Sequence, residues 1–296
     1  MSRLFPAFVS LQVINACDSR CVFCPGKSLR GSFPHAYMSE VLMEQILAEI
    51  ARHRDQVEEI DLNLHCEPTL DFRLVSLCRW LSDFGYPPQV ITNGSRIHDH
   101  DLDELVRYTS LIQFSMHGGR DAGRRERYMS GLDHEQCYRN VEAMGQAIKR
   151  SGRLVTLRVT DMFCPGPEEE AQGKRWAELA GCENFEFVRP RLLQRALAVD
   201  LGVRAGPRVT CGSLCGPHRL GGILWDGTMI VCSADWQQQY SPGRIYDDGT
   251  IEDLFNSEVA NRLRWESSGE VDLPEDHICR RCCAVPPLEA LPGKRK

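Results

Sequence analysis

Apolar runs and amphipathic stretches alternate along the chain from residue 8 to about residue 190. The apolar runs are rich in β-branched and aromatic side chains, which is typical of strands. They predict strands at 8–14, 58–64, 88–92, 111–116, 153–161 and 184–189. Between them apolar residues recur at helical spacing, with Ser39 placed to cap the first helix and Gly152 and Gly181 placed to end the last two. These stretches predict helices at about 39–53, 72–83, 100–108, 133–150 and 168–181.

Six successive strand–helix units indicate an α/β fold with a parallel sheet and right-handed crossovers. A closed barrel of this kind has eight strands, so six predict an open, partial (β/α)6 barrel, with a doubly wound sheet as the alternative. In both folds, ligands bind at the carboxyl ends of the strands. The alternation stops at about residue 195, so we expect a barrel over 1–195, a connector over 196–210 and a C-terminal module over 211–296.

Three cysteines follow the first predicted strand in the spacing C-x3-C-x2-C, namely Cys17, Cys21 and Cys24. Thiolates are soft ligands that select iron–sulfur clusters or zinc. Three of them on one loop can hold three irons of a four-iron four-sulfur cluster, which leaves the fourth iron open to a small chelating molecule. A zinc site is the alternative.

This loop, with Phe23 directly before its last cysteine, resembles that of the radical S-adenosylmethionine (SAM) superfamily. The resemblance implies a partial barrel in which the open iron chelates the amino and carboxylate groups of SAM. It also implies that an electron from the cluster cleaves a C–S bond of SAM and yields a 5′-deoxyadenosyl radical. Phe23 is by the same resemblance a residue of the cofactor site.

Further residues at predicted strand ends match the superfamily. Cys66-Glu67-Pro68 resembles its Gly-Glu-Pro motif, which implies that Glu67 binds the SAM amino group by a charge-assisted hydrogen bond. Cys66 departs from the glycine of that motif, which puts close approach of the backbone to the ligand in question. The resemblance also implies ligand contacts by Asn93, in an Asn-Gly turn, and by Ser115. Arg158 lies within an apolar strand and needs a partner there, and we expect the SAM carboxylate to supply it.

Other candidates concern the substrate. His117 and the pair Arg189 and Arg191 follow predicted strands and are candidate substrate ligands, with a structural histidine and a solvated loop as the alternatives. Cys164 lies just past the fifth strand and is the candidate hydrogen-atom donor. Cys182 is a second candidate, although it precedes the sixth strand; core packing is the alternative for both thiols.

The last third of the chain carries a second set of cysteines. An Asp226-Gly227 turn between apolar runs predicts a hairpin, and cysteines lie on either side of it. The pattern resembles the twitch module, a shorter relative of the SPASM domain, which implies one auxiliary four-iron cluster. Cys211 could replace the first ligand and Cys283 the last, and a zinc ribbon is the alternative. The implied ligands are Cys215, Cys232, Cys279 and Cys282.

Composition narrows the possible classes of protein further. With 35 basic and 41 acidic residues the net charge is −6, so the chain has no electrostatic footprint for nucleic acid. We expect the basic cluster Arg120, Arg124, Arg125 and Arg127 to be a solvated loop. No apolar run is long enough to span a membrane. Fourteen cysteines without an export signal predict thiols and metal ligands in a reducing, cytoplasmic compartment.

Small members of this superfamily with one auxiliary cluster include epimerases and alcohol dehydrogenases of aminoglycoside antibiotic pathways. The resemblance implies hydrogen abstraction from a carbinol carbon of a small sugar- or aminocyclitol-type substrate, and an electron donor such as flavodoxin or ferredoxin. We expect epimerisation with a cysteine hydrogen donor. The alternatives are two-electron dehydrogenation to a ketone through the auxiliary cluster, and a non-catalytic scaffold that binds SAM or metal.

Overall fold

The computed structural model describes residues 3–24, 35–188, 193–194, 216–268, 271–274, 277–281 and 283–284. Its described part contains a nine-stranded sheet in the order β12-β11-β10-β1-β3-β4-β5-β7-β8. The strands of the barrel are β1 (Phe8–Leu11), β3 (Glu59–Asp61), β4 (Gln89–Thr92), β5 (Leu111–Ser115), β7 (Thr156–Thr160) and β8 (Phe185–Val188). Each pairs in parallel with the next, so the six predicted strands and their parallel order are confirmed.

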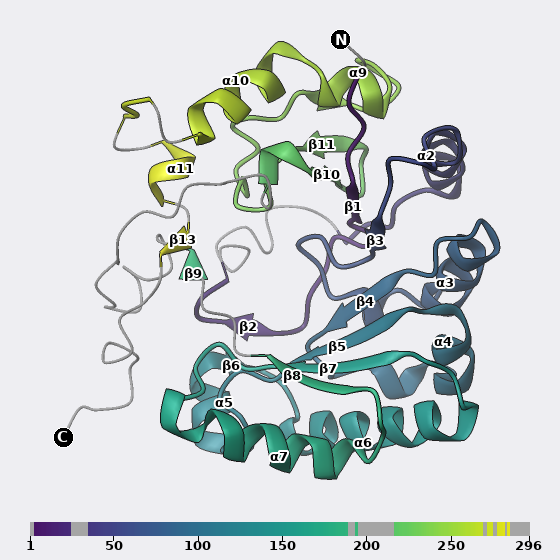
Figure 1. Ribbon diagram of the computed structural model, residues 1–296, viewed down its shortest axis with the longest axis vertical. Helices are drawn as coiled ribbons and strands as arrows, with labels where there is room; N and C mark the ends of the chain where they lie inside the picture. The colour runs from purple at the N-terminus through teal and green to yellow at the C-terminus, as the bar shows by residue number, and fades with distance from the viewer. Residues whose placement is uncertain are drawn as a thin grey trace.

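The helices of the barrel lie along one side of this sheet (Figure 1). They are α2 (Glu40–Arg52), α3 (Leu74–Asp83), α4 (Leu102–Tyr108), α5 (Ala122–Tyr128), α6 (His134–Ser151) and α7 (Glu169–Ala180). Ser39 caps α2 by accepting a hydrogen bond from the Leu42 N–H, and Gly152 and Gly181 end α6 and α7 in the left-handed conformation. The described residues contain no helix that is long and apolar enough to cross a membrane.

Alternation along the strands gives the sheet two different faces. Phe114 and Leu157 are fully buried in the main core, which the helices cover. Their neighbours Gln113, Arg158 and Glu186 lie opposite one another in register on the other face. The face without helices therefore carries polar side chains, as a face that lines a ligand site requires.

The C-terminal hairpin extends the barrel sheet rather than forming a sheet of its own. It consists of β10 (Leu220–Ile223) and β11 (Thr228–Ile230), with β12 (Gly243–Arg244) at the outer edge. β10 pairs in parallel with β1, from Phe8 opposite Leu220 to Leu11 opposite Ile223. The hairpin itself was predicted from Asp226-Gly227, but its place beside the first strand was not.

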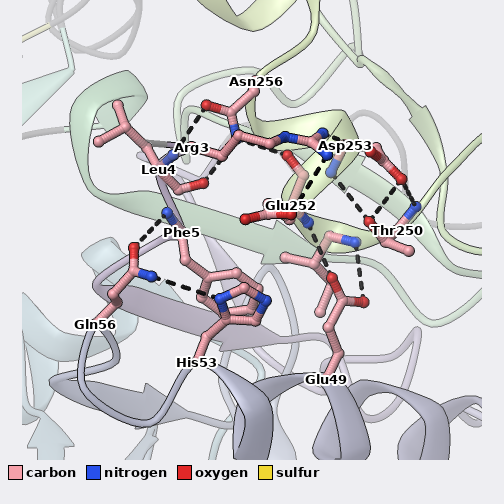
Figure 2. A network of polar contacts seen from close by, with 11 residues as sticks. Arg3, Leu4, Phe5, Glu49, His53, Gln56, Thr250, Glu252, Asp253 and Asn256 are labelled. Atoms are coloured by element: carbon pink, nitrogen blue, oxygen red, sulfur yellow. Dashed lines mark hydrogen bonds and ion pairs between the residues drawn. The ribbon is translucent and has the colours of Figure 1, made fainter. Parts of the chain in front are cut away.

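In the described part of the chain three short helices follow the hairpin, and the first of them is tied to the barrel. They are α9 (Ile251–Phe255), α10 (Glu258–Ser267) and α11 (Ile278–Arg281). The buried carboxylate of Glu49, on α2, accepts hydrogen bonds from the N–H groups of Ile251 and Glu252 at the start of α9 (Figure 2). The N-terminus of the chain lies beside the same helix, where Arg3 forms ion pairs with Glu252 and Asp253 (Figures 1 and 2).

The prediction for the basic cluster was wrong in its conformation and for Arg125. Arg124, Arg125 and Arg127 lie in α5 instead of a loop, and Arg125 is 0% exposed, whereas Arg120 and Arg127 are exposed as expected. α5 leads into β6 (Met129–Ser130), which pairs with β2 (Arg20–Cys21). The cluster is therefore part of the structure that supports the first cysteine loop.

Candidate cofactor and active site

The cysteine loop leaves the carboxyl end of β1 and is held by an antiparallel pairing. Cys21 lies in β2 opposite Met129, and the Val22 N–H donates to the Tyr128 carbonyl at 3.0 Å. The Ser19 hydroxyl lies 2.9 Å from the buried Cys21 Sγ. Cys17 and Cys24 are partly exposed on the same loop.

Glu67 follows β3 and is 2% exposed. Its Oε1 accepts hydrogen bonds from the Thr69 N–H and from the hydroxyls of Thr69 and Thr92, and its Oε2 accepts one from the Asn93 N–H at 2.7 Å. Burial raises the pKa of Glu67 to about 7, and these hydrogen bonds oppose that rise. Among the described residues Oε2 has a single donor, so it can accept a further hydrogen bond, for example from an ammonium group.

Asn93 connects Glu67 to the cysteine loop. Its Nδ2 donates to Asp18 Oδ1 at 2.7 Å and lies 4.0 Å from Cys17 Sγ. The Glu67 N–H donates to the carbonyl of Ala16 at 2.8 Å. Three predicted features, the cysteine loop, Glu67 and Asn93, are thus brought together at one edge of the sheet.

Cys66 occupies the glycine position of the motif, directly before Glu67. Its Sγ donates to the Leu62 carbonyl at 3.5 Å, and its side chain packs against the main core. Burial raises the pKa of the Cys66 thiol well above its ordinary value. The preceding residue, His65, absorbs the unusual backbone conformation with a φ of 55°.

Ser115 and His117 lie at the end of β5. Ser115 is partly exposed and lies opposite Thr160. His117 is buried, its Nδ1 accepts the Met162 N–H at 3.1 Å, and its ring meets Phe23 edge-on at 4.9 Å. Burial and then Arg125 lower the pKa of His117 to about 3, so the ring is neutral with its proton on Nε2. His117 therefore lies beside the cysteine loop as a neutral hydrogen-bond donor.

Arg158 already has a partner within the sheet. Its Nε and Nη2 donate to Glu186 Oε2 at 2.8 and 2.7 Å, across the β7–β8 pair. We expected the SAM carboxylate to supply the counter-charge, but the neighbouring strand supplies one. The part of Arg158 in cofactor binding stays a prediction.

The two candidate hydrogen donors lie at opposite ends of the strands. Cys164 is 1% exposed just past the carboxyl end of β7, and its Sγ donates to the Pro165 carbonyl at 3.6 Å. The adjacent Phe163 stacks on Tyr128 at 4.0 Å and lies 5.4 Å from Phe23 of the cysteine loop. Cys182 lies at the amino end of β8, away from this group.

In the C-terminal module, Cys232 and Cys279 are both buried and belong to the main core. Asp235 accepts hydrogen bonds from the Gln239 and Tyr240 N–H groups, which orders the turn after Cys232. The Cys279 N–H donates to His277 Nδ1 at 3.1 Å. Cys283 lies in β13 (Cys283–Ala284), which pairs with β9 (Leu193–Gln194). The other predicted residues, Arg189, Arg191, Cys211, Cys215 and Cys282, lie outside the described residues.

One pair of residues was missed from the sequence. The rings of His65 and Trp236 stack at 3.6 Å with an interplanar angle of 16°, and His65 Nε2 lies 2.9 Å from the Ser233 carbonyl oxygen. Burial lowers the pKa of His65 to about 4. The pair joins the loop that carries Glu67 to the loop after Cys232. No local pattern signals a contact between residues so far apart in the chain.

Comparison with known families agrees with this geometry. The family model of the radical SAM superfamily matches residues 11–168, which is more than half of the chain. The chain belongs to the radical SAM superfamily. A second model, that of the SPASM iron–sulfur cluster-binding domain, matches residues 215–283. A comparison with curated proteins gives no significant match.

Solved structures of radical SAM proteins have the same fold. BtrN in complex with AdoMet and 2-DOIA is 15% identical, covers 90% of this chain and 89% of its own, and has a TM-score of 0.57. SuiB of Streptococcus suis bound to S-adenosylmethionine is 13% identical over 88% of this chain and 68% of its own, with a TM-score of 0.65. The structure of anSMEcpe with bound AdoMet is 15% identical, covers 88% of this chain and 81% of its own, and has a TM-score of 0.56. At these identities the likeness shows the fold.

The residues present fit the cofactors that the two families imply, a four-iron four-sulfur cluster with SAM in the barrel and an auxiliary iron–sulfur cluster in the C-terminal module. Cys17, Cys21 and Cys24 supply three soft ligands on one loop, and Glu67 supplies a buried carboxylate beside them. This radical SAM protein is accordingly an enzyme rather than the non-catalytic scaffold of the alternative.

Proposed function

We propose that this radical SAM enzyme abstracts a hydrogen atom from a carbinol carbon of a small sugar- or aminocyclitol-type substrate and inverts that carbon. The Cys164 thiol returns the hydrogen atom. The observation that supports this proposal is the position of Cys164, a buried thiol just past the end of β7, at the edge of the sheet that also bears the cysteine loop. Phe163, next to Cys164 in the chain, is in ring contact with Phe23 of the cysteine loop.

When bound, the cluster and SAM supply the 5′-deoxyadenosyl radical that removes the substrate hydrogen. The chain supplies the surroundings. Glu67 receives the ammonium group of SAM through its Oε2. Tyr128, Phe163 and Phe23 exclude water beside the cysteine loop. His117, neutral and with its proton on Nε2, donates a hydrogen bond to a substrate oxygen.

The atoms balance as follows. The substrate C–H bond breaks and its hydrogen leaves on the adenosyl carbon. The S–H bond of Cys164 then breaks, and a new C–H bond forms on the opposite face of the substrate. The thiyl radical that results takes up one electron and one proton before the next turnover, and the electron comes from the external reductant.

Dehydrogenation is the second candidate, and one observation favours it. β10 of the C-terminal module pairs directly with β1, so Cys232, just past the hairpin, belongs to the same packed core as the barrel. The likeness to BtrN, crystallised with AdoMet and 2-DOIA, extends over most of both chains. In this outcome the carbinol radical gives up a proton and a second electron, and no hydrogen returns to the carbon.

Turnover in deuterated water separates the two outcomes. We expect one solvent deuterium at an inverted carbon, because a thiol exchanges its hydrogen with solvent, and no net oxidation of the substrate. Mass spectrometry and NMR of the product measure both. A ketone that lacks the label would refute the epimerase proposal and support dehydrogenation.

Substitution of Cys164 tests the donor itself. Cys164→Ala should abolish inversion while 5′-deoxyadenosine still forms under dithionite. Cys78→Ala is the matched control, because Cys78 is an equally buried thiol on α3, on the helix side of the sheet. Inversion at the normal rate in Cys164→Ala would rule this donor out.

A further inference from the structure

Arg125 is a charged residue that the preceding mechanism does not use. It lies on α5 and is 0% exposed. Its Nε donates to His134 Nδ1 at 3.0 Å and its Nη1 lies 3.1 Å from Met116 Sδ, while its Nη2 is buried without a hydrogen-bond partner. The Tyr138 ring lies 5.6 Å from the guanidinium carbon. None of these partners carries a negative charge.

The nearby carboxylates do not neutralise it directly. Asp161 is buried, but its Oδ1 accepts the N–H groups of Gly118 and Phe163 and so holds the turn after β7. Glu126 contacts only the far side of the His134 ring, at 3.1 Å from Nε2. Within the described part of the chain, Arg125 forms no ion pair. A buried charge of this kind is costly unless a counter-charge is present.

The position of Arg125 points to that counter-charge. Its carbonyl accepts the N–H of Met129, and Met129 lies opposite Cys21 in the β6–β2 pair. α5 and β6 thus lie beside the segment that holds the cysteine loop, and Cys21 is among the groups with which the buried guanidinium interacts electrostatically. Burial lowers the pKa of Arg125, and Cys137, Tyr138, Asp161 and Cys21 act in the opposite direction.

We propose that Arg125 is the counter-charge of the iron–sulfur cluster held by Cys17, Cys21 and Cys24, and that it makes this cluster easier to reduce. The net charge of a cluster is one of the quantities that set its reduction potential. A reduced cluster carries one more negative charge than an oxidised one, so a nearby buried cation stabilises the reduced form more. The effect is large because the interior screens charges weakly. Arg125 acts through the cluster as a positioning residue, whether the substrate is inverted or oxidised.

The experiment is a redox titration of the reconstituted protein without SAM, followed by electron paramagnetic resonance. Arg125→Gln removes the charge and keeps a polar side chain, and Arg125→Lys keeps the charge. At a fixed potential we expect the reduced-to-oxidised ratio of the first cluster to fall about tenfold in Arg125→Gln, a shift of about 59 mV to more negative potential for a one-electron couple. Arg125→Lys should restore most of the ratio. The auxiliary cluster, whose predicted ligands lie in the C-terminal module, serves as the internal reference.

A second variant covers the case in which Arg125→Gln fails to fold. Cys137 lies on α6 and is also buried, and its thiol interacts electrostatically with Arg125. Cys137→Asp places a carboxylate beside the guanidinium, which should shift the potential in the same negative direction. Iron and sulfide counts show whether each variant carries its clusters. They therefore distinguish the loss of a cluster from a change in its reduction potential.

SAM binding, measured by equilibrium dialysis, distinguishes the other role that a buried arginine can have. If Arg125→Gln keeps the wild-type potential but binds SAM at least tenfold more weakly, the arginine serves SAM and the proposal is wrong. An unchanged potential in both Arg125→Gln and Cys137→Asp would also overturn it.

Discussion

Truncation of Glu49 should loosen the C-terminal module from the barrel. The Glu49 carboxylate accepts hydrogen bonds from the N–H groups of Ile251 and Glu252 at 3.1 and 3.0 Å (Figure 2). The Tyr246 hydroxyl lies 3.0 Å from the same carboxylate and 2.7 Å from the Gln45 carbonyl oxygen. Glu49 thereby provides an anion at the amino end of α9 from a different part of the chain. In Glu49→Ala the two N–H groups lose their partner in a buried place, whereas the Tyr246 hydroxyl keeps the Gln45 carbonyl.

The expected loss of stability in Glu49→Ala follows from the two backbone N–H donors, those of Ile251 and Glu252. A buried N–H without a partner costs about 1–3 kcal/mol, and two of them, one only part-buried, give about 2–4 kcal/mol. At 1.4 kcal/mol per tenfold change, opening of α9 should become at least about 30-fold more frequent. Glu49→Gln keeps one acceptor oxygen and should cost about 1 kcal/mol.

Amide hydrogen exchange of Ile251–Phe255, read by mass spectrometry on the anaerobic holoenzyme, measures this opening. Glu44→Ala is the matched control, because Glu44 is an exposed acid on the same helix, and it should change stability by less than about 0.5 kcal/mol. If α9 in Glu49→Ala exchanges within about threefold of the wild type, hydrogen bonds to Glu49 do not hold the module and the reasoning is wrong.

Three further predictions concern the site. Because burial raises the pKa of Glu67 to about 7, its carboxylate becomes protonated as the pH falls below 7. The affinity for SAM, measured by equilibrium dialysis, should therefore drop between pH 7.5 and 5.5, and Glu67→Gln should bind SAM weakly at every pH. A wild-type affinity that does not depend on pH would contradict this. Cys21→Ala should lose the first cluster and all 5′-deoxyadenosine formation while retaining the iron of the auxiliary cluster, whereas unchanged iron content would contradict the ligand assignment. Trp236→Ala should lower the free energy of unfolding in urea by about 0.5–1.5 kcal/mol more than the loss of buried tryptophan surface accounts for, because the stack on His65 is lost. His65→Ala added to Trp236→Ala should then lower the free energy of unfolding little further.

The regular elements of the barrel were predictable because their signals are local. α6 shows a 3.6-residue apolar period, an Asp133 cap and a terminal Gly152, and it spans His134–Ser151 against a prediction of about 133–150. α5 was missed because its seven residues, Ala122–Tyr128, are mostly polar and its buried side chains include an arginine. A periodicity of apolar residues cannot register a helix that buries a charge.

Site residues divide in the same way. The cysteine loop and Glu67 could be predicted since each motif is contiguous in the chain and follows a strand whose carboxyl end is determined by the fold class. The partner of Arg158 could not, because Glu186 is 28 positions away and becomes its neighbour only when β8 pairs with β7. Cys164 was ranked above Cys182 from the sequence because it follows a predicted strand and Cys182 precedes one, and the strand direction in the structure places the two at opposite edges of the sheet.

By itself, the sequence determined the parallel order of six strands, the cysteine spacing and the superfamily, because spacing and periodicity act within a few residues of each site. Only the tertiary structure decided that β10 extends the sheet beside β1, that Trp236 stacks on His65 and that the buried Arg125 lies near Cys21. These features depend on contacts between segments distant in the chain, and the free energy of such contacts comes from burial and pairing that no single segment possesses before the chain has folded.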